Sequence, residues 1–419
     1  MYDSSQETNS SDIRSNSGFA AKRDTKNYYK RVEVYLQATN KISSQDENSQ
    51  VIGIESLYNL LEKYVNPALK DLPFRILYQN LCIYAFENEN TQINTNSMGC
   101  LGFLSTLNAE SFPIDYILNP NVIDVIKQRV YSQNGEMVNA SLLLLSYIIM
   151  YSSDTRELLL NDEGLINYCT GLTEQYQVAP FCYSVVFPNG LINEEYIEVM
   201  SPIIYKHLLS PLEYNAQKAI EYLYQLHKLK VFEIDYVAIS RSLVHLLNTK
   251  NTKIIEFSLR FTGILSNPDA ELITSMIKVA SRSIISAKLG YKYLRSLLPH
   301  MTEDLIQFFY QSLIKSMNSC SHSVGNYVII ALVDIIEFVG ELDFTIIPLL
   351  IKYLSSKKKL TIQLCINGLV SLAQKAEISG KTLDFLSQIE EYKEDFEMLS
   401  MSDNPHVAEL SNSFLEKLN

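Results

Sequence analysis

The chain of 419 residues contains no tryptophan and little glycine or proline, with 14 and 12 residues respectively. Because sandwiches, barrels and doubly wound sheets need many turn residues, this scarcity argues against a sheet-based fold. Lys and Arg number 35 against 47 Asp and Glu, so the formal net charge is -12. Wholesale nucleic-acid binding is therefore disfavoured, since neutralising phosphates requires an excess of basic residues.

Targeting and metal-binding patterns are also missing. The six cysteines form no C-x-x-C pair and show no zinc-ligand spacing with the six histidines. We interpret them as reduced, buried residues of a cytoplasmic or nuclear protein. The polar start lacks the pattern of a secretory signal, and the longest apolar stretch, residues 140–151, is too short to cross a bilayer. The sequence predicts no membrane span.

Two regions differ in composition. Residues 1–50 are expected to be a largely disordered polar and basic tail with a short helix near residues 28–38, because their apolar content is too low to offset the entropy of ordering. From residue 51 to residue 419 the chain changes to apolar helical stretches that follow short polar turns. Copies begin at Leu208, Leu246, Ser316 and Tyr353, with a weaker one at Ser281.

The spacing of these copies, about 35 to 38 residues, is typical of helical repeat proteins. It predicts about nine or ten units in one all-α array. In the copy from Leu208 the second helix has Ala216, Ala219 and Ile220 on an apolar stripe. One helix pair cannot bury such a stripe alone, so stacking on the next pair supplies the core.

The unit from Val122 to Leu165 resembles an armadillo repeat. It has a helix, a polar turn, a long second helix with Ala140 near its start, a third helix and a Glu163-Gly164-Leu165 step into the next unit. Most other units lack that glycine and are similar to two-helix HEAT repeats. The resemblance implies a right-handed armadillo-like α-α superhelix, or solenoid.

Length and unit count are similar to those of the importin-alpha cargo adaptors. Residues 22–37 (KRDTKNYYKRVEVYLQ) resemble a reduced importin-beta-binding segment, in which a basic stretch runs into a helix. The resemblance implies that an importin-beta-type carrier, or an acidic groove of the chain itself, would pair with the basic residues Lys22, Arg23, Lys26, Lys30 and Arg31.

Importin-alpha grooves use Trp and Asn residues on successive inner helices, and the Trp faces hold lysines of the cargo by cation-π attraction. Here the aligned Trp positions are Gly102, Leu143, Glu221, Leu259, Lys292, Ile330 and Asn367. The aligned Asn positions are Thr106, Tyr147, Gln225, Gly263, Ser296, Asp334 and Ser371. A conventional groove for nuclear signals is therefore not encoded. The polar members Thr106, Tyr147, Gln225, Ser296, Asp334 and Ser371 are nevertheless predicted to face a partner.

The sequence shows no clear catalytic or cofactor motif. Residues 379–382 (SGKT) imitate the end of a phosphate loop, but Lys375 stands where the motif needs glycine, so we expect a turn between helices. His207, His227 and His245 lack a second ligand at helical spacing and are interpreted as structural. The 27 tyrosines suit either packing or protein interfaces. We expect no cofactor, no metal and no enzymatic activity.

The sequence thus favours a non-enzymatic adaptor or scaffold that holds a peptide or a partner helix in a groove. One version is an atypical nuclear-transport adaptor. The alternative is a structural or regulatory subunit of a larger complex unrelated to transport. In both, the partners are other proteins, and neither nucleic acid nor membrane is bound directly.

Overall fold

The computed structural model describes residues 32–63, 74–105, 112–188, 191–265, 268–340, 344–354 and 359–418. Within these ranges the regular structure is entirely helical and no residue lies in a β-strand, so the all-α prediction is confirmed. None of the helices described there combines the length and the apolar composition needed to cross a membrane. The residues predicted above that lie outside the described ranges are Lys22, Arg23, Lys26, Lys30, Arg31 and Thr106.

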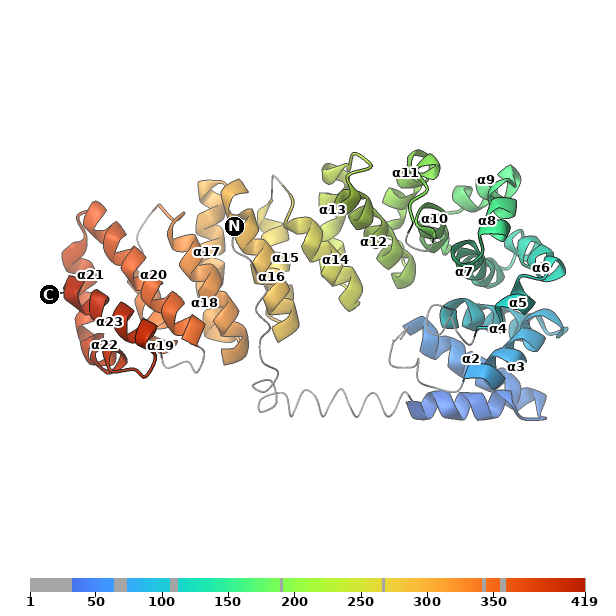
Figure 1. Cartoon of the computed structure of the whole chain (residues 1–419), viewed down its shortest axis with the longest axis horizontal. Helices are drawn as coiled ribbons and strands as arrows, with labels where there is room; N and C mark the ends of the chain where they lie inside the picture. The colour runs from blue at the N-terminus through green and yellow to red at the C-terminus, as the bar shows by residue number, and fades with distance from the viewer. Residues whose placement is uncertain are drawn as a thin grey trace. The chain divides into compact units, whose positions relative to one another are not determined.

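The chain divides into two compact units, Met1–Ala219 and Ile220–Asn419, and the boundary falls inside helix α12 (Glu213–Leu229). In the first unit, residues 32–42 form a helix. The helices that follow it in this unit (Figure 1) are α2 (Glu47–Lys63), α3 (Phe74–Phe86), α4 (Thr91–Leu104), α5 (Ile114–Ile117), α6 (Pro120–Val130), α7 (Gly135–Tyr151), α8 (Ser153–Leu160), α9 (Glu163–Gly171), α10 (Val178–Val186), the 3-10 turn η3 (Glu194–Tyr196) and α11 (Ile197–His207).

The first unit has two layers of helices. In layer A, α4 packs on α7 and α7 packs on α10. In layer B, α3, α6 and α11 pack on α4, α7 and α10 respectively. Helix α7 is at the centre of this arrangement, and its residues Leu142–Leu145 are all buried. An apolar run of this kind is stable in water only when neighbouring helices cover it on several sides.

The second unit repeats the two-layer scheme. Its layer A consists of α14, α16, α18 and α20, each packed on the next, and its layer B contains α13, α15, α17 and α19. The helices of this unit are α13 (Tyr236–Leu247), α14 (Thr252–Thr262), α15 (Ala270–Ala280), α16 (Ile284–Leu297), η4 (Leu298–His300), α17 (Glu303–Ser319), α18 (His322–Ile336), η5 (Phe344–Ile346), α19 (Ile347–Lys352), α20 (Lys359–Ile378), α21 (Thr382–Ile389), η6 (Glu390–Tyr392), α22 (Lys393–Ser400) and α23 (Pro405–Leu418). The predicted armadillo-like stacking of helices is thus found within each unit.

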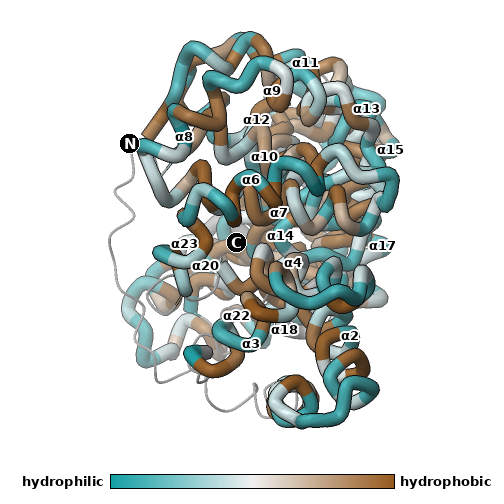
Figure 2. The backbone as a smooth tube through the Cα atoms, turned by 90° about the vertical axis from the view of Figure 1, so that its right-hand side faces the viewer, coloured by the Kyte–Doolittle hydropathy of each residue, from teal (hydrophilic) through white to brown (hydrophobic). Residues whose placement is uncertain are grey.

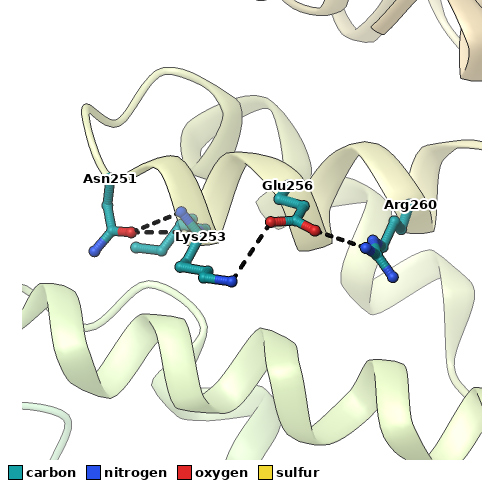
Figure 3. Close-up of polar contacts among 5 residues, drawn as sticks. Asn251, Lys253, Glu256 and Arg260 are labelled. Atoms are coloured by element: carbon teal, nitrogen blue, oxygen red, sulfur yellow. Dashed lines mark hydrogen bonds and ion pairs between the residues drawn. The ribbon is translucent and has the colours of Figure 1, made fainter. Parts of the chain in front are cut away.

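Asparagine side chains begin several layer A helices. Asn90, Asn134 and Asn251 cap α4, α7 and α14, and each side-chain oxygen accepts hydrogen bonds from two backbone N–H groups of the first turn. Figure 3 shows the bonds of Asn251. These N–H groups have no partner inside the helix, so the caps stabilise each start by about 1 kcal/mol. The polar turns seen in the sequence therefore set where the helices begin.

The predicted repeat period reappears in hydrogen bonds between successive repeats. Bonds that involve a side chain join residues 35, 36, 38 and 39 positions apart. Hydrophobic and hydrophilic residues alternate within single helices (Figure 2), as stacked amphipathic helices require. Residues 379–381 of the SGKT stretch form the turn between α20 and α21, in which Gly380 has a φ of 70°, so the interpretation of this stretch as a turn is confirmed.

Candidate functional site

A pocket of about 410 Å³ opens on layer A of the first unit. It spans α4, α7, α10 and the first two turns of α12, all on the Met1–Ala219 side of the unit boundary. The lining residues are Gly102, Ser105, Leu143, Ser146, Tyr147, Met150, Tyr151, Pro180, Tyr183, Ser184, Tyr214, Gln217 and Lys218. Their spacing of three and four residues on each helix gathers one face of every helix at the pocket.

Close approach of α4 and α7 shapes the floor. A Cβ atom placed on Gly102 would lie 2.8 Å from the Cβ of Leu143, which is shorter than real carbon contacts, so glycine is needed at this crossing. Gly102 and Leu143 are two of the residues that the sequence alignment above placed at Trp positions of importin-alpha. No side chain of that size fits at Gly102, which is the structural reason why a tryptophan slot cannot form there.

Tyr147 is the most unusual residue of the pocket. Its side chain is only 8% exposed, and its hydroxyl has no hydrogen-bond partner among the residues that the structure describes. The ring packs against Phe112 with 4.6 Å between centroids and against Tyr151 with 5.7 Å. Burial raises the pKa of the hydroxyl, so it stays protonated at neutral pH. A buried hydroxyl that could both donate and accept costs free energy until a ligand supplies the bond.

Tyrosine faces and one cation form the other wall. Lys218 Nζ lies 4.4 Å from the ring centroid of Tyr183 and 5.9 Å from that of Tyr214. Tyr214 in turn meets Phe103 edge to face at 5.9 Å. Cation-π contacts of this geometry attract the ammonium group to the ring faces. The pocket is therefore aromatic and polar, with its positive charge already placed over a ring.

Two asparagines hold the loops behind the pocket in position. The Asn139 side-chain oxygen accepts from the backbone N–H of Gln177 at 2.8 Å, and the Asn215 oxygen accepts from that of Ala179 at 2.7 Å. The Asn215 amide nitrogen also lies 2.8 Å from His207 Nδ1. Burial lowers the pKa of His207 to about 4, so the ring is neutral and can accept this bond. These bonds satisfy backbone groups at the start of α10 that would otherwise be buried unpaired.

The predicted ladder residues are spread over both units. Tyr147 lines the pocket, and Ser105, the neighbour of Thr106, lines it as well. The other four belong to the second unit: Gln225 and Ser371 are partly exposed on α12 and α20, Ser296 is exposed on α16, and Asp334 on α18 accepts a hydrogen bond from Arg295. In the second unit, Asp334 thus contacts Arg295, the residue that precedes Ser296. Whether the ladder contacts a partner stays a prediction.

Among the lining residues that the sequence reasoning missed are Tyr151, Tyr183, Tyr214 and Lys218. Tyr151 follows Tyr147 by one helical turn, which is a signal that could have identified it. Tyr183 lies on α10, and no clear repeat copy is visible in the sequence between Leu165 and Leu208, so the register of α10 is not predicted. Tyr214 and Lys218 lie in the copy from Leu208, but the apolar stripe predicted for that copy does not include them.

Histidines and cysteines do not converge. His207 contacts Asn215, and His227 Nδ1 lies 2.9 Å from the Tyr236 hydroxyl. In the part of the chain that the structure describes, no group of three His, Cys, Asp or Glu side chains is placed to hold a metal ion. The chemistry offered by the pocket is recognition through rings, hydroxyls and one ammonium group.

Comparisons with known proteins gave matches in structure only. No protein-family model and no curated protein sequence matches the chain. An engineered protein aligns over 92% of this chain and 98% of its own length, with 15% identity and a TM-score of 0.45. A structure from work on a phosphorylation switch in the cadherin and beta-catenin interaction aligns over 91% and 80%, with 14% identity and a TM-score of 0.43.

Computationally designed armadillo repeat proteins for modular peptide recognition align over 52% of this chain and 99% of their own length, with 19% identity and a TM-score of 0.35. The function of this chain is therefore argued from its own pocket and charges.

Proposed function

We propose that this chain is a non-enzymatic protein-binding scaffold that holds a segment of a partner protein in the pocket of the first unit. The observation that carries the proposal is the Tyr147 hydroxyl, which is buried, lines the pocket and has no hydrogen-bond partner among the described residues. Of the buried side-chain polar atoms that lack a partner among the described residues, the Tyr147 hydroxyl is the one that belongs to the pocket lining, and a ligand that completes the bond is a sufficient reason for keeping it.

The lining suits a peptide. Tyr147, Tyr151, Tyr183 and Tyr214 present large apolar faces with polar tips, and such side chains lose little entropy on binding. A peptide backbone offers an acceptor and a donor at every residue, so it can satisfy the Tyr147 hydroxyl in either direction. Side chains of the partner would then fill the apolar part of the pocket around Leu143 and Met150.

Site-specific photocrosslinking tests the proposal. A photoreactive phenylalanine replaces Tyr151, which is 44% exposed in the pocket, or Tyr131, which is 47% exposed at the end of α6 away from it. In cells, we expect a defined protein to be crosslinked from position 151 and not from position 131. Recovery of the same proteins in equal amounts from both positions would contradict the proposal.

A Tyr147→Phe variant then measures the role of the hydroxyl on the captured partner. Losing one hydrogen bond worth about 0.5 to 1.5 kcal/mol weakens binding about two- to tenfold. The fold should be unaffected, because the hydroxyl has no hydrogen-bond partner among the described residues. Tyr131→Phe is the matched control and should bind like the unmodified protein. Unchanged affinity of the Tyr147 variant would mean that the hydroxyl is not used.

A narrower candidate is a nuclear-transport adaptor. What favours it is the charge of residues 20–32, which contain five basic residues and one acidic residue in a chain of net charge -12. The charged residues of this stretch are outside the described ranges. A pull-down with an importin-beta-type carrier compares the intact chain with one lacking residues 1–40. Equal binding or no binding by both would remove this candidate and leave a subunit of a stable complex as the alternative.

A further inference from the structure

Basic residues concentrate on two neighbouring helices of layer A in the second unit. Together α14 and α16 contain five basic residues and one acidic residue, whereas the whole chain has an excess of twelve acidic charges. We call this surface the α14/α16 basic band, and it consists of Lys253, Arg260, Lys288, Lys292 and Arg295. Such a local reversal of sign in an acidic protein marks a surface that attracts anions.

Arg260 is held in position by its surroundings. Its guanidinium lies 2.6 Å from a carboxylate oxygen of Glu256, and the second oxygen of Glu256 lies 3.7 Å from Lys253 Nζ (Figure 3). The guanidinium is also 5.4 Å from the ring centroid of Tyr224 and 5.8 Å from that of Phe257. The ring contacts and the ion pair pre-organise Arg260, which lowers the entropic cost of binding a further anion.

Helix α16 continues the band. Lys288 and Lys292, one helical turn apart, are both exposed, and neither forms an ion pair among the described residues. Lys292 Nζ lies 5.6 Å from the Tyr293 ring centroid. The remaining member, Arg295, pairs with Asp334 of α18. When the two acids Glu256 and Asp334 are subtracted from the five basic residues, an excess of three positive charges remains.

We infer that the α14/α16 basic band docks an acidic peptide segment, rich in Asp and Glu, of a partner protein. The inference rests on the proposed scaffold function but uses another surface than the Tyr147 pocket. Complementary charge steers such a segment to the band and selects it over neutral ones. Carboxylates can pair with the ammonium groups of Lys288 and Lys292 and share Arg260 with Glu256.

Other occupants fit less well. A basic segment would be repelled, and the rings it would need are already contacted by Arg260 and Lys292. The same contacts occupy the tyrosine faces on which the bases of a single-stranded nucleic acid would otherwise stack. Three excess charges are also few for neutralising the phosphates of a nucleic acid, in a chain whose net charge is -12.

The test uses the full chain and three fluorescent peptides of identical length, in which Glu, Gln or Lys alternates with Gly and Ser. Binding is measured by fluorescence anisotropy at about 0.05 and about 0.5 M salt, where screening differs strongly. We expect the Glu peptide to bind at least about tenfold more tightly than the Gln peptide at low salt, and the difference to shrink at high salt. The Lys peptide should not bind.

Charge reversal locates the surface. K288E/K292E should weaken binding of the Glu peptide about tenfold, because two attractions become repulsions. The matched control K278E/K315E changes the net charge equally at exposed lysines of α15 and α17 in layer B, and it should bind within about twofold of the unmodified chain. Unchanged melting curves verify that both variants fold.

Three outcomes would overturn the inference: equal binding of the Glu and Gln peptides, equal loss in the control variant, or a single-stranded oligonucleotide that binds more tightly than the Glu peptide. The variant Y147F separates this surface from the pocket, since it should leave the Glu peptide bound normally. If Y147F loses its captured partner while the Glu peptide fails to bind, the scaffold function stands and the basic band does not. If Y147F keeps its captured partner at unchanged affinity while the Glu peptide binds as expected, the basic band is supported and the role of the pocket hydroxyl is not.

Discussion

The layer A helices of the two units have the same stacking but different chemistry. In the first unit α4, α7 and α10 contain one charged residue, Glu136, and many buried Ser, Thr and Asn side chains. In the second unit α14 and α16 alone contain six charged residues. The same repeat thus provides two kinds of surface, because only the buried face of each helix is constrained by packing.

This difference predicts two modes of recognition. A pocket of rings and hydroxyls depends on shape and on short hydrogen bonds, so salt should affect it little. A band of exposed lysines acts over about a Debye length, roughly 8 Å at physiological salt, and should respond strongly to salt and to charge reversal. Variants of the first unit should therefore change stability and close contacts, whereas variants of the second unit should change electrostatic attraction.

The largest effect on stability is expected from Asn215→Ala in the first unit. The change removes the acceptor of the Ala179 N–H and the neighbour of His207 Nδ1, both buried, which costs about 2 to 4 kcal/mol of unfolding free energy. Urea denaturation followed by circular dichroism measures this, and hydrogen exchange at Ala179 localises it. Asn248→Ala, which removes an exposed bond to the Val244 carbonyl, is the control and should cost under about 0.5 kcal/mol. Equal losses would contradict the assignment.

A pH effect of somewhat smaller size is expected from His207. Its side chain is 1% exposed, and burial lowers its pKa in the folded chain from 6.5 to about 4. The unfolded chain therefore binds a proton below pH 6.5 that the folded chain does not bind until about pH 4. Stability is complete above pH 6.5 and falls as the pH drops toward 4, by on the order of 2 to 3 kcal/mol.

The measurement compares unfolding free energies at pH 7 and pH 5 for the unmodified chain and for His207→Gln, which retains an acceptor for Asn215. The variant should lose less stability on acidification than the unmodified chain. Carboxylates contribute equally to both proteins, so the difference between the two slopes reports His207 alone. Parallel slopes would show that the imidazole is protonated without cost and that its burial is not maintained.

The sequence predicted the helices well because their signals are local. Asn90, Asn134 and Asn251 lie in polar turns and cap the helices that follow, and the apolar stripe of each helix shows which face is buried. The alignment of repeats also placed Gly102 and Leu143 at one equivalent position and Tyr147 one helical turn after Leu143, and all three line the same pocket. Periodicity is enough for that result, since equivalent positions in stacked repeats are neighbours.

The tertiary bonds could not be obtained from local signals. Asn139 and Gln177 are 38 residues apart, and Asn215 and Ala179 are 36 apart, which is about one repeat. The period shows which repeats meet but not which of many polar side chains reaches a backbone group, because that depends on the depth of each helix in the stack. The neutral state of His207 was hidden for the same reason, since burial rather than sequence neighbours lowers its pKa.

The smallest expected effect tests the difference in charge between the two units. Asp334→Asn removes the carboxylate paired with Arg295, and because both side chains are about one-third exposed, water already weakens this pair. The unfolding free energy should fall by less than about 1 kcal/mol. The variant leaves the positive charge of Arg295 within the α14/α16 basic band without its paired carboxylate, so the Glu peptide should bind about two- to threefold more tightly at low salt. Asp304→Asn, an exposed residue of layer B, makes the same charge change and should leave that affinity unaltered. If both variants tightened binding alike, the attraction would come from the net charge of the chain and not from the placement of its basic residues.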